Sequence, residues 1–361
     1  MPLPFHADDR PATLNRQESL AAFLNSKSVR PDTLTPHALA SLSEAARQDY
    51  NRKRRVFISG GMTIMTPQVL SARRLLGDCF SENVGRNSGH SGLMLDGQSG
   101  AGKTTTCKTL MQTVWSDYFR QFPDALERGH FPVVYVEVPA GSTGKLLMRE
   151  FASFFGLSVR ASESMSSIRS RVVDVLNAAR TQLIVVDELH NLAGRAAGLG
   201  ESVDLLKNLH NDLGATFTYA GIDLKSGQLL AGPRGQQLLG RFTFLNMRSL
   251  RMSDPVDRAT WTALIRSFET QLPLSEHEAG SLETHQDYLF KRTGGSIGSL
   301  GRLLTRAAIR TIENPELPEI INLPLMDEIV LDKAAEDFYE KSRRPPKPKP
   351  KPKLKIVEDF S

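Results

Sequence analysis

The chain has 361 residues, of which 40% are hydrophobic and 24% charged, and its formal net charge at pH 7 is +5. This composition is typical of a globular protein of one or two domains and excludes a fibrous or wholly disordered chain. No apolar run approaches the roughly 20 residues needed to cross a bilayer, and the N-terminus has no apolar signal-peptide core. We therefore expect a cytoplasmic protein with no membrane partner.

The excess of basic charge lies at the C-terminal end. Residues 343–355, RRPPKPKPKPKLK, hold seven Lys and Arg residues and no acid, so that subtracting them from +5 leaves the rest of the chain at −2. Alternating Pro and Lys cannot form helix interior or sheet, and we expect residues 341–361 to be a disordered, extended tail. Nucleic-acid binding by the folded part would therefore depend on local basic patches.

Two segments precede the first strong strand pattern. Residues 1–50 mix Pro, Ser, Thr and charged residues with short apolar turns, which favours a mobile arm with short helices. Residues 51–90 begin with the basic cluster Arg52–Arg55, which we expect to lead into a short extended stretch. A helix then starts at Thr66-Pro67, since Thr is a good N-cap and Pro fits the first helical turn. The helical patterns around Cys79 and Cys107 indicate two buried thiols.

Between residues 91 and 250, apolar runs of strand length alternate with helical patterns. The runs are GLMLD, PVVYVEV, LIVVD, TFTYAG and FTFLNM. Continuous apolar strands separated by helices predict a mostly parallel sheet with helices on both faces, which is a three-layer α/β domain. Residues 251–340 have helical patterns throughout, including one across residues 323–339, and predict a small helical subdomain.

A phosphate-binding loop is predicted between the first strand and the next helix. The stretch GQSGAGKTT, residues 97–105, fits the pattern G-x-x-x-x-G-K-[ST]. Its glycines allow backbone N–H groups to turn toward the phosphates of ATP, its lysine would reach the outer phosphates, and its first threonine would ligate Mg²⁺. The predicted nucleotide-binding residues are Gly97, Gln98, Ser99, Gly100, Ala101, Gly102, Lys103, Thr104 and Thr105.

The second half of the predicted site is LIVVDELHN, residues 183–191. Asp187 ends a buried strand and is expected to hold the Mg²⁺ shell together with Thr104. Glu188 would orient and deprotonate a water, which ATP hydrolysis requires because phosphoryl transfer is mostly alignment and charge stabilisation. The alternative for both carboxylates is an acidic first turn of a helix, and we treat His190 and Asn191 as local polar residues.

A cation at the γ-phosphate would complete an ATPase site. Arg241, just before the strand FTFLNM, is the first candidate and Arg234 the second. An arginine at this edge of the domain would serve the ATP of a neighbouring subunit. Such head-to-tail contacts make a homo-oligomeric ring or an open helical filament. The alternative for Arg241 is a surface salt bridge.

The order of these motifs resembles that of AAA+ ATPases, and more closely that of the TniB/TnsC family of transposition regulators. The closer resemblance covers about residues 45–310 and rests on ARQDYNRKRRVFISGGMTIMTPQVLSARRLL, GLMLDGQSGAGKTTT, VEVPAGSTGKLLMREFASFFGLS and GRFTFLNM. It implies an AAA+ P-loop domain followed by a helical lid. It also implies P-loop roles for Lys103 and Thr104, second-Walker-motif roles for Asp187 and Glu188, and an arginine finger at Arg241.

The family resemblance further implies a regulator that oligomerises on double-stranded target DNA when ATP is bound. Such a regulator recruits a DDE transposase, in some cases with a target-selector protein, and disassembles on ATP hydrolysis. The DNA contacts would lie in the loop after the second strand and in the helices that follow, where Lys145 and Thr143 are the first candidates and Arg169 and Arg171 the next. Arg169 and Arg171 are two residues apart and do not share a helical face. The cluster Arg52–Arg55 and the tail are further candidates for contacts with DNA or the transposase, and each of these cations has the alternative of being a solvated surface charge.

Two positions depart from the usual AAA+ pattern. The sensor position after the fourth strand falls near Ile222, with Thr218 or Asp223 as substitutes. In the lid, Gly298 stands about where many AAA+ proteins have an arginine, and Arg302 follows one turn later. Coupling between nucleotide state and lid is therefore expected to differ from the usual form.

Three other functions remain open at this point. A helicase-loader-like AAA+ ATPase would have another ATPase as its main partner, and a STAND-type signalling or defence switch would bind no nucleic acid. A small-molecule kinase is disfavoured, because the sequence has no evident acceptor-substrate domain and carries the water-positioning Glu188.

Overall fold

The structure is a computed structural model that describes residues 13–192 and 196–343, with only the backbone of residues 196–200. The predicted C-terminal tail lies outside the described residues from position 344 onward, as do residues 1–12 of the predicted arm. Within the described part of the chain, no helix combines the length and apolarity needed to span a membrane.

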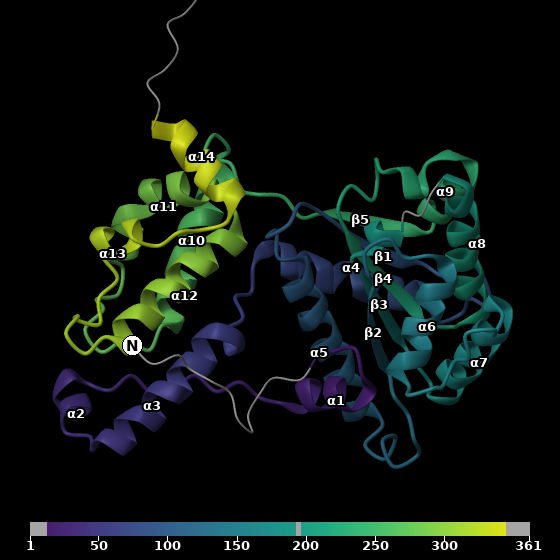
Figure 1. Cartoon of the computed structure of the whole chain (residues 1–361), viewed down its shortest axis with the longest axis horizontal. Helices are drawn as coiled ribbons and strands as arrows, with labels where there is room; N and C mark the ends of the chain where they lie inside the picture. The colour runs from purple at the N-terminus through teal and green to yellow at the C-terminus, as the bar shows by residue number, and fades with distance from the viewer. Residues whose placement is uncertain (1–12, 193–195, 344–361) are drawn as a thin grey trace, which may run out of the picture.

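A parallel sheet forms the centre of the larger part of the molecule (Figure 1). Its five strands pair in the order β2-β3-β4-β1-β5, and every neighbouring pair is parallel. Strands β1 to β4 are buried along nearly their whole length, as continuous apolar runs predict. The prediction of a parallel sheet built from these five runs is confirmed. The strands are β1 (Gly92–Asp96), β2 (Val133–Glu137), β3 (Leu183–Asp187), β4 (Thr216–Gly221) and β5 (Phe242–Asn246).

Helices cover both faces of the sheet, which gives the expected three layers (Figure 1). Helices α4 and α5 lie on one face, while α6, α7 and α8 lie on the other with α9 against α8. The connection from β1 to β2 runs in the opposite direction across the sheet from the later ones, so right-handed crossovers place its helix on the opposite face. The helices are α4 (Pro67–Asn83), α5 (Lys103–Gln121), α6 (Gly144–Phe154), α7 (Met165–Ala178), α8 (Ala196–Asp212) and α9 (Gly232–Leu239), with short turns η2 (Leu189–Leu192) and η3 (Gln228–Leu230).

A second hydrophobic core belongs to the helical lid after β5. Trp261, Leu303 and Met326 are fully buried there. The predicted helix over residues 323–339 is interrupted, because Asp332 caps a new helix and Arg292 donates a hydrogen bond to the carbonyl oxygen of Ile329 within the interruption. The lid elements are α10 (Pro255–Gln271), η4 (Leu282–His285), α11 (Gln286–Thr293), α12 (Ile297–Glu313), α13 (Leu323–Asp327) and α14 (Lys333–Arg343).

The described N-terminal residues are docked on both halves of the molecule (Figure 1). Leu20 is fully buried against the sheet domain, and Asn25 accepts a hydrogen bond from the indole N–H of Trp115 at 2.9 Å. The expected mobile arm is therefore not observed from residue 13 onward. The helices of this segment are α1 (Gln17–Asn25), α2 (Pro36–Ala40) and α3 (Glu44–Val56).

Helix α3 continues directly into the π-helical turn η1 (Phe57–Gly61), and both elements pack on α12 of the lid. The prediction of an extended stretch after residue 55 is wrong. The physical reason is that Phe57 and Ile58 bury their side chains in the lid core, which the helical continuation of α3 allows.

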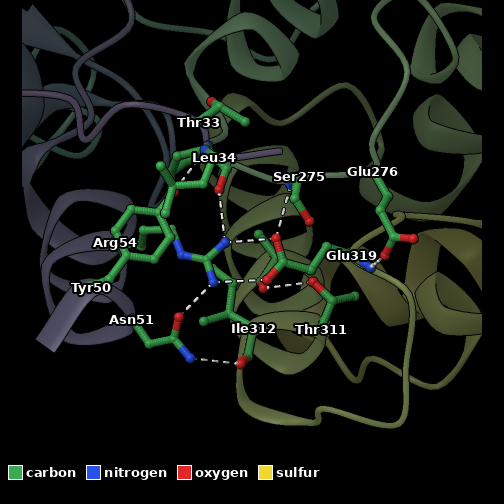
Figure 2. Close-up of polar contacts among 12 residues, drawn as sticks. Thr33, Leu34, Tyr50, Asn51, Arg54, Ser275, Glu276, Thr311, Ile312 and Glu319 are labelled. Carbon is green, nitrogen blue, oxygen red and sulfur yellow. Dashed lines mark hydrogen bonds and ion pairs between the residues drawn. The ribbon is translucent and has the colours of Figure 1, made fainter. Parts of the chain in front are cut away.

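The basic cluster at the end of α3 is engaged inside the protein, as Figure 2 shows for Arg54. The guanidinium of Arg54 is fully buried and forms a bidentate pair with Glu319 at 2.6 and 2.8 Å, with further hydrogen bonds to Asn51 and to the carbonyl oxygen of Pro273. Arg55 pairs with Glu313 at 2.9 Å, while Arg52 and Lys53 pair with Asp49. The prediction that this cluster offers four cations to DNA or a partner is therefore corrected, because Arg54 and Arg55 hold α3 on the lid.

Candidate nucleotide site

The P-loop follows β1 and leads into α5, as predicted from the sequence. Gly100 and Gly102 have positive φ angles of 77° and 87°. Gly97 packs so closely on the chain after β5 that a Cβ would lie 2.0 Å from the carbonyl oxygen of Met247. Lys103 is 6% exposed and donates hydrogen bonds to two carbonyl oxygens of the loop, at 2.7 and 3.1 Å. Its ammonium group therefore lies inside the loop, where a phosphate would meet it. The loop residues open to solvent include Gln98, Ser99, Thr104 and Thr105, while Ala101 is half-buried.

Asp187 lies at the carboxyl end of β3, next to the start of α5. Its Oδ2 accepts a hydrogen bond from the Thr104 hydroxyl at 2.9 Å and one from the Tyr135 hydroxyl at 3.3 Å. Its Oδ1 accepts from the backbone N–H of Glu188 at 2.8 Å. The structure thus brings together the two residues predicted to bind Mg²⁺, and it adds Tyr135 from β2, which sequence reasoning missed because nothing in a strand pattern marks one buried tyrosine.

Glu188 lies beside a histidine that the sequence marks only as a local polar residue. Nδ1 of His190 is 3.3 Å from Oε2 of Glu188 and also 3.3 Å from the backbone nitrogen of Ile222. These contacts exclude each other, since an unprotonated nitrogen accepts from Ile222 and a protonated one donates to Glu188. His190 can therefore bind either Glu188 or the backbone just after β4, the region where AAA+ proteins place a sensor. Its position two residues after Glu188 was the only signal in the sequence.

A third carboxylate, Glu137, lies at the end of β2 in register with Asp187. Partial burial raises the pKa of Glu137, and the nearby charges of Asp187 and Glu188 raise it further. Burial likewise raises the pKa of the Cys107 thiol on α5. The carboxyl ends of β2 and β3 therefore bring three carboxylates close together, and one of them, Asp187, contacts Thr104 of the P-loop.

The residues considered as replacements for the usual AAA+ sensor residues lie at different distances from the P-loop end of the sheet. Thr218 is buried in the middle of β4, in register with Leu93, so it does not reach the P-loop end of the sheet. Asp223 follows β4 in a left-handed conformation with φ of 51°. Arg302 pairs with Asp332 at 3.5 Å within the lid.

Arg241 lies at the opposite end of the sheet from the P-loop. Its carbonyl oxygen accepts a hydrogen bond from Gly92, the first residue of β1, whereas the P-loop follows the last residue of β1. A five-residue strand separates these two edges by about 16 Å. The guanidinium donates to Oδ1 of Asn211 at 2.7 Å, and the second candidate, Arg234, pairs with Asp204 at 2.9 Å. Arg241 therefore does not lie at the nucleotide edge of its own subunit.

The four candidate DNA-contacting residues differ in their availability. Arg169 pairs with Asp212 and Arg171 with Glu163. Thr143 caps α6 by accepting a hydrogen bond from Leu146.

Lys145 in the first turn of α6 donates to the carbonyl oxygen of Ala161, at 3.2 Å, and has no carboxylate partner in the described ranges of the chain. Arg149 follows Lys145 by four residues and shares its helical face. Lys145 and Arg149 therefore form a pair of half-buried cations on one face of α6, and spacing of four on a helix was the signal for the second.

Comparison with known proteins agrees with this fold. Residues 86–225 match the family of AAA domains. The chain also resembles the ORC1 protein of Aeropyrum pernix, solved in complex with DNA, with a TM-score of 0.55 and 17% identity over 80% of this chain and 70% of that chain. The chain has an AAA+ fold and contains an AAA-type ATPase domain.

Two structures of the ORC2 protein from Aeropyrum pernix are similar to this AAA+ chain to the same degree. The ADP form gives a TM-score of 0.55 at 16% identity over 78% of this chain and 72% of that chain. The form with ADPNP and ADP gives 0.53 at 16% identity over 73% and 68%. No curated protein sequence matches the chain. The resemblance to the TniB/TnsC family stays a prediction from the sequence.

Proposed function

We propose that the protein is an AAA+ ATPase that hydrolyses ATP in a head-to-tail oligomer assembled on double-stranded DNA. The observation that carries this proposal is the division of the catalytic groups between two ends of one sheet. Lys103, Asp187 and Glu188 meet at the carboxyl ends of the strands, whereas Arg241 lies at the amino ends. A site that needs an arginine at the γ-phosphate is then complete only when a second copy supplies it.

Each residue of the nucleotide edge has a role in this proposal. Lys103 binds the outer phosphates, and Glu188 orients a water for attack on the γ-phosphate and takes its proton. The backbone of Glu188 has a φ of 55°, which is strained for a residue with a side chain. Such strain is common at functional sites and fits a catalytic role for this carboxylate. When its Nδ1 carries the proton, His190 donates to Glu188 and would orient that carboxylate.

The oxygen donors at this edge fit a magnesium ion. The hydroxyl of Thr104 and the carboxylate of Asp187 are hard ligands 2.9 Å apart, at the junction of the P-loop and β3. No set of three or more His, Cys, Asp or Glu side chains in the described ranges would hold a metal ion alone, so phosphate oxygens and waters would complete the shell. When bound, magnesium would neutralise charge on the β- and γ-phosphate oxygens.

Support for DNA binding comes from the fold and from one surface. The similar ORC1 protein of Aeropyrum pernix was solved in complex with DNA. Lys145 and Arg149 on α6 form a pair of cations on one helical face. Contacts of this type bind phosphates without reading sequence and weaken strongly with salt.

Two finer functions are compatible with such an ATPase. The fold comparison supports a replication-initiator or helicase-loader-like role, with another ATPase as partner. The sequence stretches that resemble the TniB/TnsC family support a transposition regulator that recruits a DDE transposase to target DNA. The two functions are distinguished by a pull-down with the ATP-bound protein as bait. Retention of a DDE transposase from the same genome would support the transposition regulator, and retention of a replicative helicase would support the helicase-loader-like role.

The core proposal is tested by electron microscopy with duplex DNA and a slowly hydrolysed ATP analogue. We expect rings or filaments that need both DNA and the analogue and that are lost as salt rises. Lys103→Ala should abolish them, and the double variant Lys145→Ala/Arg149→Ala should weaken them more than Arg171→Ala does. Absence of any DNA-dependent oligomer at low salt would instead favour a signalling switch without nucleic acid.

A further inference from the structure

The lid touches the P-loop through its backbone. The N–H of Gly298 in the first turn of α12 donates a hydrogen bond to the carbonyl oxygen of Gly100 at 2.9 Å. The hydroxyl of Ser296, which caps α12, lies 3.4 Å from the same oxygen. Two segments almost 200 residues apart in sequence therefore meet at the loop that would surround the phosphates.

The contact depends on the absence of a side chain at position 298. A Cβ at Gly298 would lie 2.5 Å from the carbonyl oxygen of Gly100 and 3.0 Å from its Cα. Both atoms are backbone atoms of the P-loop, so a clash would have to be relieved by moving the loop or the lid. Within the described part of the lid, the arginine one turn later, Arg302, is paired with Asp332 rather than with the P-loop.

The same turn is also fixed to the linker between the sheet domain and the lid. The N–H of Leu250 donates to the carbonyl oxygen of Gly295 at 3.0 Å, and a Cβ at Gly295 would lie 2.2 Å from the oxygen of Leu250. At the other end of α12, Asn51 and Arg55 of α3 contact Ile312 and Glu313. Helix α12 is thus held at its start by the P-loop and the linker, and at its end by α3.

We propose that Gly298 is the positioning residue through which the lid senses occupancy of the P-loop. Phosphates would order the loop and fix the Gly100 carbonyl in place, and the backbone hydrogen bond from Gly298 would then hold α12 over the bound nucleotide. This inference rests on the proposed nucleotide function of the site. In this inference, the backbone contact between Gly298 and Gly100 couples the lid to the nucleotide, in place of an arginine of the lid.

The test is the rate at which a fluorescent ATP analogue leaves Gly298→Ala. Loss of one hydrogen bond and displacement of the lid should raise the release rate by roughly three- to tenfold. Turnover at saturating ATP should change less than KM, because the substitution does not alter the groups that act on the γ-phosphate. Gly301→Ala is the matched control, since it adds the same methyl group to α12 but meets only the Phe268 ring, at 3.3 Å.

Hydrogen exchange of the unmodified protein provides a second measurement that does not depend on any variant folding. Amides of residues 295–300 should exchange more slowly when the ATP analogue is bound. Unchanged exchange in this segment, or equal release rates from Gly298→Ala and the parent, would overturn the inference. Failure of the proposed nucleotide function gives a different result, in which Lys103→Ala binds the analogue as well as the parent does.

Discussion

At the residue scale, the site depends on how Asp187 and Glu188 are held. Asp187 is 1% exposed and accepts three hydrogen bonds, two from side chains and one from the backbone N–H of Glu188. Glu188 lies in the left-handed region at a cost of about 1 kcal/mol or more for a residue with a side chain. The carboxylate of Asp187 offsets part of this cost through that backbone hydrogen bond. The two neighbouring acids are therefore held differently: Asp187 is fixed by three hydrogen bonds, whereas Glu188 is partly exposed, as its proposed role in activating water requires.

The first prediction concerns Glu188→Gln. The variant should bind ATP like the parent, because the P-loop is unchanged, but it should lose most hydrolysis, since an amide cannot take the proton of the attacking water. DNA-bound oligomers should then persist in ATP, as followed by light scattering after dilution. Glu201→Gln on the exposed side of α8 serves as control. If Glu188→Gln disassembles at the parental rate, Glu188 is not the hydrolytic group.

The second prediction concerns pH and His210, which is fully buried at the end of α8 and stacked on Phe217. Burial, followed by the charges of Arg241 and His90, lowers the pKa of His210 to about 3. The unfolded chain binds a proton there near pH 6.5, whereas the folded chain does not, so stability is present above pH 6.5 and falls as the pH drops below it. Between pH 7.5 and 5.5 this residue should account for a loss of about 1.4 kcal/mol.

Urea unfolding of His210→Phe at these two pH values checks the second prediction. Neither ring nitrogen of His210 has a hydrogen-bond partner among the described residues, so phenylalanine should fit the stack and flatten the pH dependence. His37→Gln, at an exposed position, should leave the dependence unchanged. An equal loss of stability in His210→Phe and the parent would contradict the assignment.

At the element scale, α3 is part of the lid although it precedes the whole sheet in sequence. The Arg54–Glu319 pair is buried, and the Tyr50 ring lies 4.5 Å from the guanidinium of Arg54 (Figure 2). Burial raises the pKa of Glu319, but hydrogen bonds from Arg54 and Ser275 outweigh this effect and hold the pKa below its usual value. The carboxylate therefore stays charged, and its only cationic partner among the described residues comes from α3.

The third prediction concerns Arg54→Met, which should destabilise the lid by about 3 kcal/mol because it leaves a buried carboxylate unpaired. Replacing both partners, as Arg54→Met/Glu319→Gln, should recover part of this loss. The fluorescence of Trp261, buried in the lid, follows lid unfolding in urea once Trp115 is replaced by phenylalanine.

Arg310→Met is the matched control for the third prediction. Arg310 pairs with Glu328 at the surface, where both side chains are substantially exposed, so its loss should change lid stability little. Equal effects of Arg54→Met and Arg310→Met would show that the buried pair does not hold the lid.

At the scale of the whole molecule, two hydrophobic cores are joined by three passages of the chain. The chain leaves the sheet domain after α1, returns to it before α4, and leaves it again after β5. Movement of the lid would therefore pull on both ends of α3 and η1 as well as on the linker at Leu250. Under the proposed coupling between P-loop and lid, a movement of the lid would be transmitted to α3 and η1.

The fourth prediction concerns Arg241→Ala and the assembled state. The isolated subunit should bind ATP normally, whereas DNA-stimulated hydrolysis should fall at least tenfold, because the arginine lies about 16 Å from its own nucleotide edge and can serve only a neighbour. Arg234→Ala is the matched control on the same surface. A loss in Arg234→Ala with none in Arg241→Ala would move the assignment to Arg234.

For the fourth prediction, mixing experiments show whether Arg241 acts on the ATP of a neighbouring subunit or whether Arg241→Ala is simply misfolded. Subunits with Glu188→Gln still carry Arg241, whereas Glu188→Gln/Arg241→Ala subunits do not. Added to the parent protein, the second should depress turnover more than the first. Equal depression would mean that Arg241 does not act on a neighbouring site.

Local patterns were sufficient to predict the sheet and the nucleotide edge. Each strand is one continuous apolar run, and the P-loop is defined by residues within nine positions of each other. The pairing of Thr104 with Asp187 follows from them, since the carboxyl ends of all strands in a parallel sheet lie at one edge, and β1 and β3 are separated there only by β4. The AAA domain match and the similarity to the ORC1 structure confirm the fold that these local patterns predicted.

The sequence by itself thus determined the AAA+ sheet, the order of its motifs and the groups that would bind ATP and Mg²⁺, because short-range periodicity and spacing encode them. Only the tertiary structure decided that Arg54 is buried in the lid, that His190 contacts Glu188, and that Gly298 bonds to the P-loop. The Arg54 and Gly298 contacts join segments about 200 residues or more apart, whereas the His190–Glu188 contact depends on how the turn after β3 lies beside the end of β4. The residues next to a basic or glycine-rich stretch do not determine which distant segment it contacts. The burial of Arg54 and the hydrogen bond of Gly298 are therefore determined only when the sheet domain and the lid pack together.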